Sequence, residues 1–223
     1  ADGLIRIGKV NGNWFMDHRN QDGSLAEMCG NGIRLMAHYL IVRGHQKRNI
    51  FSIETRSGSK YLSVLPNGEI SVNLGKVEPL EGEIEVQVNG KTYGGGLNVD
   101  VGNPHAVVFV DSISEIGELE SAPKVLPANT YPDGVNVEFV EFQPNGELKM
   151  RVYERGVGET RSCGTGTCAV ALAATIKRNL KLPSKWKIHP PGGTLEVEID
   201  AHQNAILTGP AVLIKDCELD KYL

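Results

Sequence analysis

Two short stretches with the same spacing, MCGNG (Met28–Gly32) and SCGTG (Ser162–Gly166), each stand immediately before an apolar run. The runs are GNGIRLMAHYLIVRG after Cys29 and GTGTCAVALAATIKRN after Cys163. Both have the length of a helix and little polar face, and helices of that kind are usually buried. We therefore predict two buried helices, each beginning just after a cysteine.

Much of the remaining sequence alternates between apolar and polar residues in short segments that are separated by Asn-Gly turns. Examples are YLSVL and ISVNL on either side of residues 66–68, VNVEFVEF before residues 144–146, and LEVEI at 195–199. Period-two alternation with such turns is typical of antiparallel hairpins. A shorter helix is expected in SISEIGELE, after Asp111.

Matching residues in the two halves of the sequence are separated by a constant number of residues, the offset, which is the same as between Cys29 and Cys163. Glycines coincide at that offset from the first glycine of each run as far as Gly75 and Gly209. An internal duplication explains this register. The sequence therefore predicts an α+β fold of two pseudo-symmetric units, with the active site in the cleft between them. Each unit is expected to be an antiparallel or mixed β-sheet wrapped around a central buried helix.

We predict an N-terminal unit at residues 1–95, a C-terminal unit at 96–214, and a tail at 215–223 that packs on the N-terminal unit. The second unit opens with VDVGNPHAVVFV, which contains Asn103 and lies far ahead of Cys163. At the offset between the halves, the equivalent of Asn103 in the first unit falls before residue 1. We therefore expect that the first unit lacks its opening strand, and that the sequence is truncated or a segment is missing.

Composition narrows the class of protein. Of the 223 residues 40% are hydrophobic and 22% charged, and the net charge of −4 gives no nucleic-acid footprint. No apolar stretch reaches the roughly 18 residues of a membrane span, and the N-terminus lacks the pattern of a signal peptide. Four cysteines are too few for a disulfide framework and fit a reducing compartment. We expect a cytoplasmic protein without nucleic-acid or membrane partners.

A cysteine just ahead of a helix lies where unpaired backbone N–H groups and the helix dipole favour negative charge. We therefore expect the pKa of both thiols to be lowered toward neutrality, and the neighbouring N–H groups to hold a carboxylate. If the two helix ends face one another, one thiolate removes the proton from the carbon beside that carboxylate. The opposite thiol returns a proton to the other face, which inverts that carbon.

Other interpretations of the cysteines stay open. A disulfide between Cys29 and Cys163 is the main rival, and it would indicate a thiol/disulfide redox-responsive or amino-acid-binding protein. Cys168 and Cys217 are interpreted as small, buried apolar residues. The stretch CGTGTC lacks the C-x-x-C spacing of a zinc site, and neither common phosphate-binding glycine motif occurs. We therefore expect no metal site and no phosphate-binding loop.

Five stretches, NQDGSLAEMCGNGIR, GNPH, GVNVEF, ERGVGETRSCGTGT and LTGPA, together resemble the motif set of the diaminopimelate epimerases. The resemblance covers essentially the whole chain. Proline racemases are similar around the cysteines but typically read Cys-Gly-His at the first, where this chain has Asn31. The resemblance implies a homodimer that interconverts L,L- and meso-diaminopimelate without a cofactor, in lysine and peptidoglycan precursor biosynthesis. A racemase of a related amino acid is the alternative.

The resemblance also implies functional residues. The acid/base thiols are Cys29 and Cys163, and His105 and Glu154 assist them in proton transfer. The substrate-binding residues are Asn20, Gly30, Asn31, Asn103, Asn136, Glu154, Arg155, Gly164 and Thr165. An arginine fork suits a carboxylate and a glutamate suits an ammonium, so Glu154 and Arg155 fit the far head group of the substrate. The family's opening stretch, which supplies a further binding asparagine, is absent from this sequence.

Overall fold

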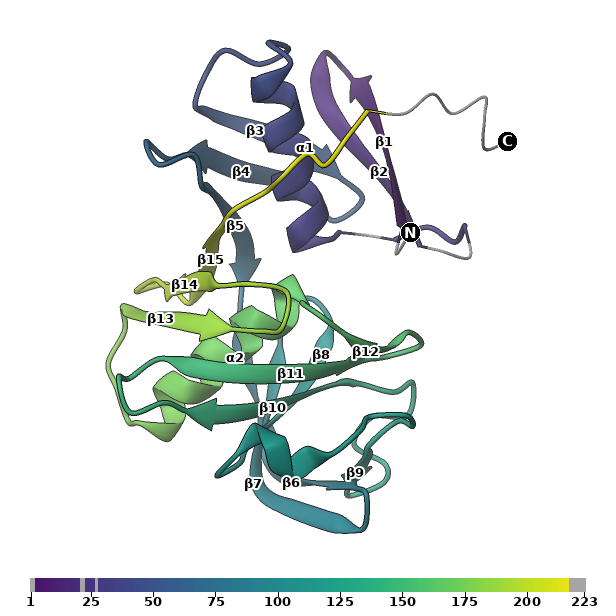
Figure 1. The fold of residues 1–223 in the computed structure, drawn as a ribbon, viewed down its shortest axis with the longest axis vertical. Coiled ribbons are helices and arrows are strands. Elements are labelled where there is room, and N and C mark those ends of the chain that lie inside the picture. Colours follow the sequence, from purple (N-terminus) through teal and green to yellow (C-terminus); the bar gives the residue numbers. More distant parts are fainter. Residues whose placement is uncertain (1–2, 21–22, 27, 217–223) are drawn as a thin grey trace.

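The computed structural model describes residues 3–20, 23–26 and 28–216. The chain forms two parts that follow one another along the long axis of the molecule (Figure 1). One part surrounds helix α1 (Gly30–Val42) and the other surrounds helix α2 (Gly164–Lys177). Strands outnumber helices in both parts, so the predicted α+β class with two helices is confirmed.

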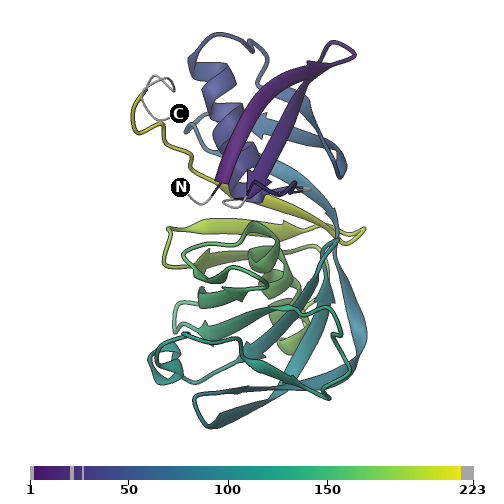
Figure 2. The ribbon, with the colours of Figure 1, turned by 90° about the vertical axis from the view of Figure 1, so that its right-hand side faces the viewer.

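The first part is a hairpin and a three-stranded meander around α1. Its strands are β1 (Gly3–Val10), β2 (Asn13–Asn20), β3 (Ile50–Thr55), β4 (Gly58–Val64) and β5 (Ile70–Lys76). Strands β1 and β2 are antiparallel, β2 meets β3 in parallel, and β3, β4 and β5 follow as antiparallel neighbours. The hairpin lies beside α1, which contacts β1, β2 and β5 (Figure 2).

The second part is larger. Its elements besides α2 are β6 (Glu78–Val88), β7 (Lys91–Asp100), β8 (Pro104–Phe109), the 3-10 turn η1 (Ile113–Ile116), β9 (Lys124–Leu126), β10 (Asn136–Phe142), β11 (Leu148–Glu154), β12 (Gly158–Thr160), β13 (Ser184–His189), β14 (Leu195–Ile199) and β15 (Asn204–Gly209). The strand order is β9-β6-β7-β8-β10-β11-β13-β14-β15, with β12 on β11. The helix predicted over 112–120 is only the single turn η1, because Gly117, with φ 70°, ends it.

The two parts are joined through strands β5 and β15, which pair in antiparallel orientation. The pairing makes one continuous strand path from β1 to β9 instead of two separate sheets. In Figure 2 these two strands run between the parts. The joint brings Leu207 of β15 against the beginnings of both helices.

Equivalent elements recur at the offset found in the sequence. The first residues of α1 and α2 are separated by the same number of residues as Cys29 and Cys163. The same separation holds for the first residues of β3 and β13, and for those of β5 and β15. Hairpin β1–β2 precedes α1 as hairpin β10–β11 precedes α2. Strand β2 meets β3 in parallel, and β11 meets β13 in the same way. The offset therefore relates whole elements and their pairing, beyond the coincident glycines.

The predicted boundary between residues 95 and 96 falls inside strand β7. Strand β6 pairs with β7, and β7 pairs with β8, so residues 78–95 lie with the second part. Ile84 and Val86 of β6 belong to an apolar cluster with Phe139 of β10. The structure thus groups this stretch with the elements that follow it in the chain.

The two helices differ in how they are covered. From Gly164 to Thr175, helix α2 is buried apart from Thr165, and strands β7, β8, β10, β13, β14 and β15 all contact it. In α1, Leu35 and Val42 are 38% and 58% exposed. Helix α2 is therefore buried on nearly all sides, as predicted, whereas α1 is buried on the face of Ile33, Met36, Ala37 and Leu40 and exposed at Leu35 and Val42.

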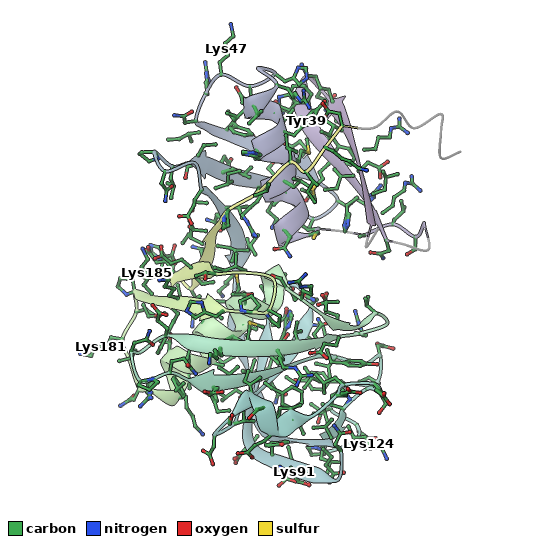
Figure 3. All side chains as sticks on the ribbon, in the orientation of Figure 1. Tyr39, Lys47, Lys91, Lys124, Lys181 and Lys185 are labelled. Atoms are coloured by element: carbon green, nitrogen blue, oxygen red, sulfur yellow. The ribbon has the colours of Figure 1, made fainter. Side chains whose placement is uncertain are left out.

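The tail and the surface complete the fold. Arg43, which caps the end of α1, forms an ion pair with Asp216, near the end of the described chain. Residues 217–223, including Cys217, lie outside the described residues, so the predictions for them are not addressed by the structure. The labelled lysines project outward from both parts (Figure 3). Within the described ranges, neither helix is long and apolar enough to cross a membrane.

Candidate functional site

The two helices begin directly against one another. A Cβ atom on Gly164 would lie 3.0 Å from the Cα of Gly30, and one on Gly30 would lie 3.3 Å from the Cα of Gly164. The Cδ2 atom of Leu207 would lie within 3.3 Å of either Cβ. Only glycine lets two backbones and a leucine approach this closely. The first glycine of each CGxG stretch therefore sets the contact between the two parts.

A cysteine sulfur caps each helix. The backbone N–H of Gly32 donates to the Sγ of Cys29 at 3.3 Å, and that of Gly166 donates to the Sγ of Cys163 at 3.4 Å. The CGxG spacing puts the second glycine at the third helical position, which an N-cap side chain reaches. Both sulfurs thus lie at the positive end of a helix dipole, beside the contact between the helices.

Asn31 ties the two helix starts together. Its Nδ2 donates to the backbone oxygen of Ser162 at 3.0 Å, across the junction. Its Oδ1 accepts from the Nη2 of the buried Arg34 at 2.9 Å, and the Nη1 of Arg34 donates to the oxygen of Gly30 at 3.1 Å. The side chain is thereby occupied by protein groups. The predicted binding role of Asn31 rests on its backbone N–H, which lies beside the Cys29 sulfur.

Burial outweighs the helix dipole in setting the acidity of the thiols. Burial raises the pKa of the Cys163 thiol well above its ordinary 9.0, and the charges of Glu154 and Glu138 raise it further. Burial also raises the pKa of the Cys29 thiol, although backbone hydrogen bonds oppose the change. The expectation of lowered pKa values is therefore wrong, because taking a thiolate out of water costs more than the hydrogen bonds at the helix start return.

Glu154 is the acidic residue that acts on both thiols. Its charge raises the pKa of Cys29 and that of Cys163. It ends strand β11, where the hydroxyl of Thr160 on β12 donates to its Oε1. A half-buried carboxylate whose charge acts on both thiols is suited to assist proton transfer. That role remains a prediction.

His105 is completely buried and is held at both ring nitrogens. Its Nδ1 lies 2.7 Å from the Oε1 of Glu138, and its Nε2 lies 3.2 Å from the Oδ1 of Asn103. Glu138 is also completely buried, and the sequence analysis did not single it out. Glu138 is the one charged residue in the stretch Asn136–Val140, whose complete burial only the structure reveals. Buried acidic residues of this kind are typical of functional sites.

Comparison with known proteins decides the family. The sequence model described as diaminopimelate epimerase matches residues 1–80 and 97–214 of this chain. The diaminopimelate epimerase of Streptomyces coelicolor is 44% identical over 212 residues, covering 93% of this chain and 73% of that protein. The chain belongs to the diaminopimelate epimerase family. The diaminopimelate epimerase of Corynebacterium glutamicum is 42% identical over 229 residues, covering 96% and 81% of the two chains.

Solved structures outside the diaminopimelate epimerase family share the fold. A PhzC/PhzF protein from Clostridium difficile matches with a TM-score of 0.70 at 14% identity, covering 96% of this chain and 81% of that chain. A probable proline racemase from Agrobacterium radiobacter matches with a TM-score of 0.64 at 16% identity, covering 92% and 71%. At such low identities the likeness concerns the fold alone.

Asn136 and Arg155, which the resemblance to diaminopimelate epimerases assigns to the far head group, are hydrogen-bonded to each other. The backbone N–H of Arg155 donates to the Oδ1 of Asn136 at 2.9 Å, and the Nδ2 of Asn136 donates to the oxygen of Pro104 at 3.2 Å. Asn136 also lies opposite His105 in the β8–β10 register. The group thus adjoins the buried His105, while the guanidinium of Arg155 is exposed.

Asn20 is the predicted residue that the structure does not join to the others. It ends strand β2, is exposed, and donates from its Nδ2 to the Oγ of Ser24 at 3.0 Å. Among the described residues, no hydrogen bond connects Asn20 to another residue of the predicted site. Its binding role in this diaminopimelate epimerase homologue stays a prediction.

Away from the two helix starts, neither the surface hollows nor the metal-ligating side chains of the described residues form a second candidate site. One surface hollow is lined by residues 87–92 and Lys124, and another by residues 12–14 and 50–52, none of them predicted site residues. In the part of the chain that the structure describes, no three His, Cys, Asp or Glu side chains are grouped to hold a metal ion. The facing helix starts therefore remain the candidate site.

Proposed function

We propose that this chain interconverts L,L- and meso-diaminopimelate by proton transfer between the thiols of Cys29 and Cys163. The observation that carries the proposal is the contact between two helix starts, each capped by a cysteine sulfur. Membership of the diaminopimelate epimerase family supplies the substrate.

In this proposal the carboxylate beside the reacting carbon binds to backbone N–H groups at the starts of both helices. Those groups belong to Gly30, Asn31, Gly164 and Thr165, which occupy the first turns. The first N–H groups of a helix have no partner within it, and two helix dipoles act on the same carboxylate. When the α-proton leaves, negative charge spreads into that carboxylate, so the same N–H groups stabilise the transition state.

The number of protons on the two thiols is the same before and after the reaction. One cysteine, as thiolate, takes the α-proton and becomes a thiol, while the C–H electron pair passes into the carbanion. The other cysteine, as thiol, gives its proton to the opposite face of that carbon and becomes the thiolate. After one turnover the two cysteines have exchanged protonation states, and the pair is set for the reverse direction. No cofactor enters this scheme.

The raised thiol pKa values act in two opposite ways. They reduce the population of thiolate in the unliganded site, because burial favours the neutral thiol. They also make each thiolate, once formed, a stronger base toward a weakly acidic α-proton. The ammonium charge of bound substrate favours the thiolate–thiol state over two neutral thiols, and it opposes the effect of the further loss of water around the sulfurs.

Selectivity at the far end of the substrate is proposed to come from a different set of groups. Arg155 provides a fork for the distal carboxylate, Glu154 faces the ammonium, and the amides of Asn20, Asn103 and Asn136 orient both. Support comes from the hydrogen bonds that join Arg155 to Asn136 and His105 to Asn103. A fixed L configuration at the distal carbon follows from several such contacts.

We also propose that the fold arose by internal duplication and consists of two pseudo-symmetric units with the active site in the cleft between them. The constant offset of helices, strands and parallel pairings supports this. We place the boundary near Val77, between β5 and β6, because β6 and β7 pair with strands of the second unit. A cytoplasmic homodimer is proposed as well. The free thiols of Cys29, Cys163 and Cys168 fit a reducing compartment.

The test is proton exchange coupled to inversion. Reduced protein is incubated with L,L-diaminopimelate in deuterated water, and α-deuterium and meso product are followed together by NMR and chiral chromatography. The proposal predicts meso product that carries one deuterium at the inverted carbon. Cys168→Ala is the matched control, because this third buried cysteine lies within α2 and has no assigned role. Turnover of proline without turnover of diaminopimelate would make the chain a racemase of another amino acid.

A further inference from the structure

A completely buried carboxylate, that of Glu138, lies at the start of α2. Its Oε1 is 2.7 Å from the Nδ1 of His105, and in the described residues its Oε2 has no hydrogen-bond partner. Burying an ionisable group with half of its oxygens unpaired is unfavourable for folding. Such a group persists where it contributes something other than stability.

Different side chains pack against the second glycine of the two CGxG stretches. The second CGxG glycines, Gly32 and Gly166, are equivalent at the offset between the halves. A Cβ on Gly32 would lie 2.9 Å from the Cδ1 of Ile5 on β1. A Cβ on Gly166 would lie 2.6 Å from the Oε1 of Glu138 on β10. Packing under the first turn of a helix is thus done by a methyl group in one half and by a carboxylate in the other.

The contacts between Glu138, His105 and Asn103 indicate where protons lie. Both ring nitrogens of His105 face oxygen atoms, the Oε1 of Glu138 and the Oδ1 of Asn103. An amide oxygen only accepts, so Nε2 carries a proton. A short contact between Nδ1 and a carboxylate oxygen requires a second proton, held between them. The three side chains therefore hold two protons, one on the Nε2 of His105 and one between its Nδ1 and the carboxylate of Glu138.

We infer that Glu138 is a positioning residue for proton transfer at Cys163. Its carboxylate holds the His105 ring in one orientation, with Nε2 protonated. The inference rests on the proposed function and names a residue that acts through His105 without touching substrate. The link to Cys163 is short, since Gly166, against which Glu138 packs, donates its N–H to the Cys163 sulfur. A methyl group such as that of Ile5, which packs against Gly32, could not serve as a hydrogen-bond partner for the His105 ring.

The charged and titratable groups around Glu138 are consistent with this role. Burial raises its pKa, His105 lowers it, and the charge of Glu154 raises it again. Its own charge raises the pKa of Cys163, so removing a proton from one group opposes removing it from the other. The hydroxyl of Tyr131 donates to the Oδ1 of Asn98 and also lies 3.3 Å from the backbone oxygen of His105. Tyr131 thus helps fix the histidine from its backbone while Glu138 fixes the ring.

The test uses Glu138→Gln, which keeps the shape and removes the charge and the proton held between His105 and the carboxylate. Glu147→Gln is the matched control, because Glu147 makes a 2.6 Å contact with His189 at the surface of the same part. We expect Glu138→Gln to lower kcat by about tenfold or more with little change in KM, and to alter the pH profile of kcat. The control is expected to do neither.

Two further measurements separate positioning from general structure. In ¹⁵N-labelled protein, the low-field proton resonance of the His105 ring is expected in the wild type and in Glu147→Gln, and to be lost in Glu138→Gln. In a double-mutant cycle, adding Glu138→Gln to His105→Gln is expected to cause no further loss of kcat. Additive losses, an unchanged ring resonance, or a Glu138→Gln loss explained by a lowered Tm alone would overturn the inference. If wild-type protein exchanges no α-proton, the proposed function fails, while the ring resonance still decides whether Glu138 holds His105.

Discussion

The contact between the two helix starts yields a prediction with a definite size. In Gly164→Ala, the added methyl group meets the Cα of Gly30 at 3.0 Å, the N of Gly30 at 3.4 Å and the Cδ2 of Leu207 at 3.3 Å. Carbon atoms at rest lie about 3.5–4.0 Å apart, so the helix starts must separate by roughly 0.5–1 Å. Two of the three opposing atoms are backbone, which cannot rotate away as a side chain can.

Two effects of this substitution oppose each other. Alanine is favoured over glycine in a helix by about 1 kcal/mol. Overpacking of a tight contact costs about 1–3 kcal/mol, and here it also breaks the approach of two backbones. We expect the overpacking to win, with a Tm lower by about 2–8 °C for a chain of this size. We also expect kcat to fall by up to about 100-fold, because the thiols are displaced relative to the reacting carbon.

Thermal unfolding by circular dichroism and deuterium exchange in diaminopimelate measure the two effects. The matched control is Gly8→Ala in strand β1, where an added Cβ meets nothing within 4 Å and φ is not positive. That variant is expected to stay within about 0.5 kcal/mol of wild type and to keep its activity. A Gly164→Ala variant that is more stable than wild type and fully active would refute the account of the helix contact.

Three further predictions follow from the same site. Asn31→Ala removes the bond to Ser162 across the junction and is expected to destabilise the fold by about 1–3 kcal/mol in urea unfolding, whereas the exposed Asn67→Ala changes little. Arg155→Ala is expected to raise KM by about tenfold or more, with a smaller effect on kcat. Arg161→Ala, an exposed neighbour, serves as its control, and an unchanged KM in Arg155→Ala contradicts the placement. Because the pKa of Cys163 is raised above 9.0 and that of Cys168 to about 12, the unfolded chain loses these protons first, so the free energy of unfolding should fall as pH rises from 9 toward 12. Flat stability over that interval would show that neither thiol is shielded as described.

Much of the fold could be predicted because the relevant signals are local or periodic. The hairpin turns, the two helices and the constant offset between the halves are all visible as sequence patterns, and the structure has the corresponding elements at that spacing. The apolar runs after the CGxG stretches predicted the helix starts, and in the structure each cysteine sulfur caps its helix by accepting from an N–H three residues on.

Predictions failed where the outcome depends on partners that are distant in the chain. The sign of the thiol pKa shifts followed from burial by other strands, which no local motif reports. The exposure of Leu35 and Val42 on α1, and the pairing of β6 and β7 with the second part, likewise depend on which strands surround each helix. Glu138 was overlooked because its partner, His105, is distant in the sequence and lies on a neighbouring strand.

The central claim is that each thiol serves one face of the reacting carbon. The most direct test compares α-proton exchange in Cys29→Ala and Cys163→Ala, each offered L,L- and meso-diaminopimelate separately in deuterated water. With one thiol left, each variant should exchange the proton of only one configuration, the two variants should have opposite preferences, and neither should invert the carbon. Inversion by either variant at a rate near that of wild type would contradict the two-thiol account.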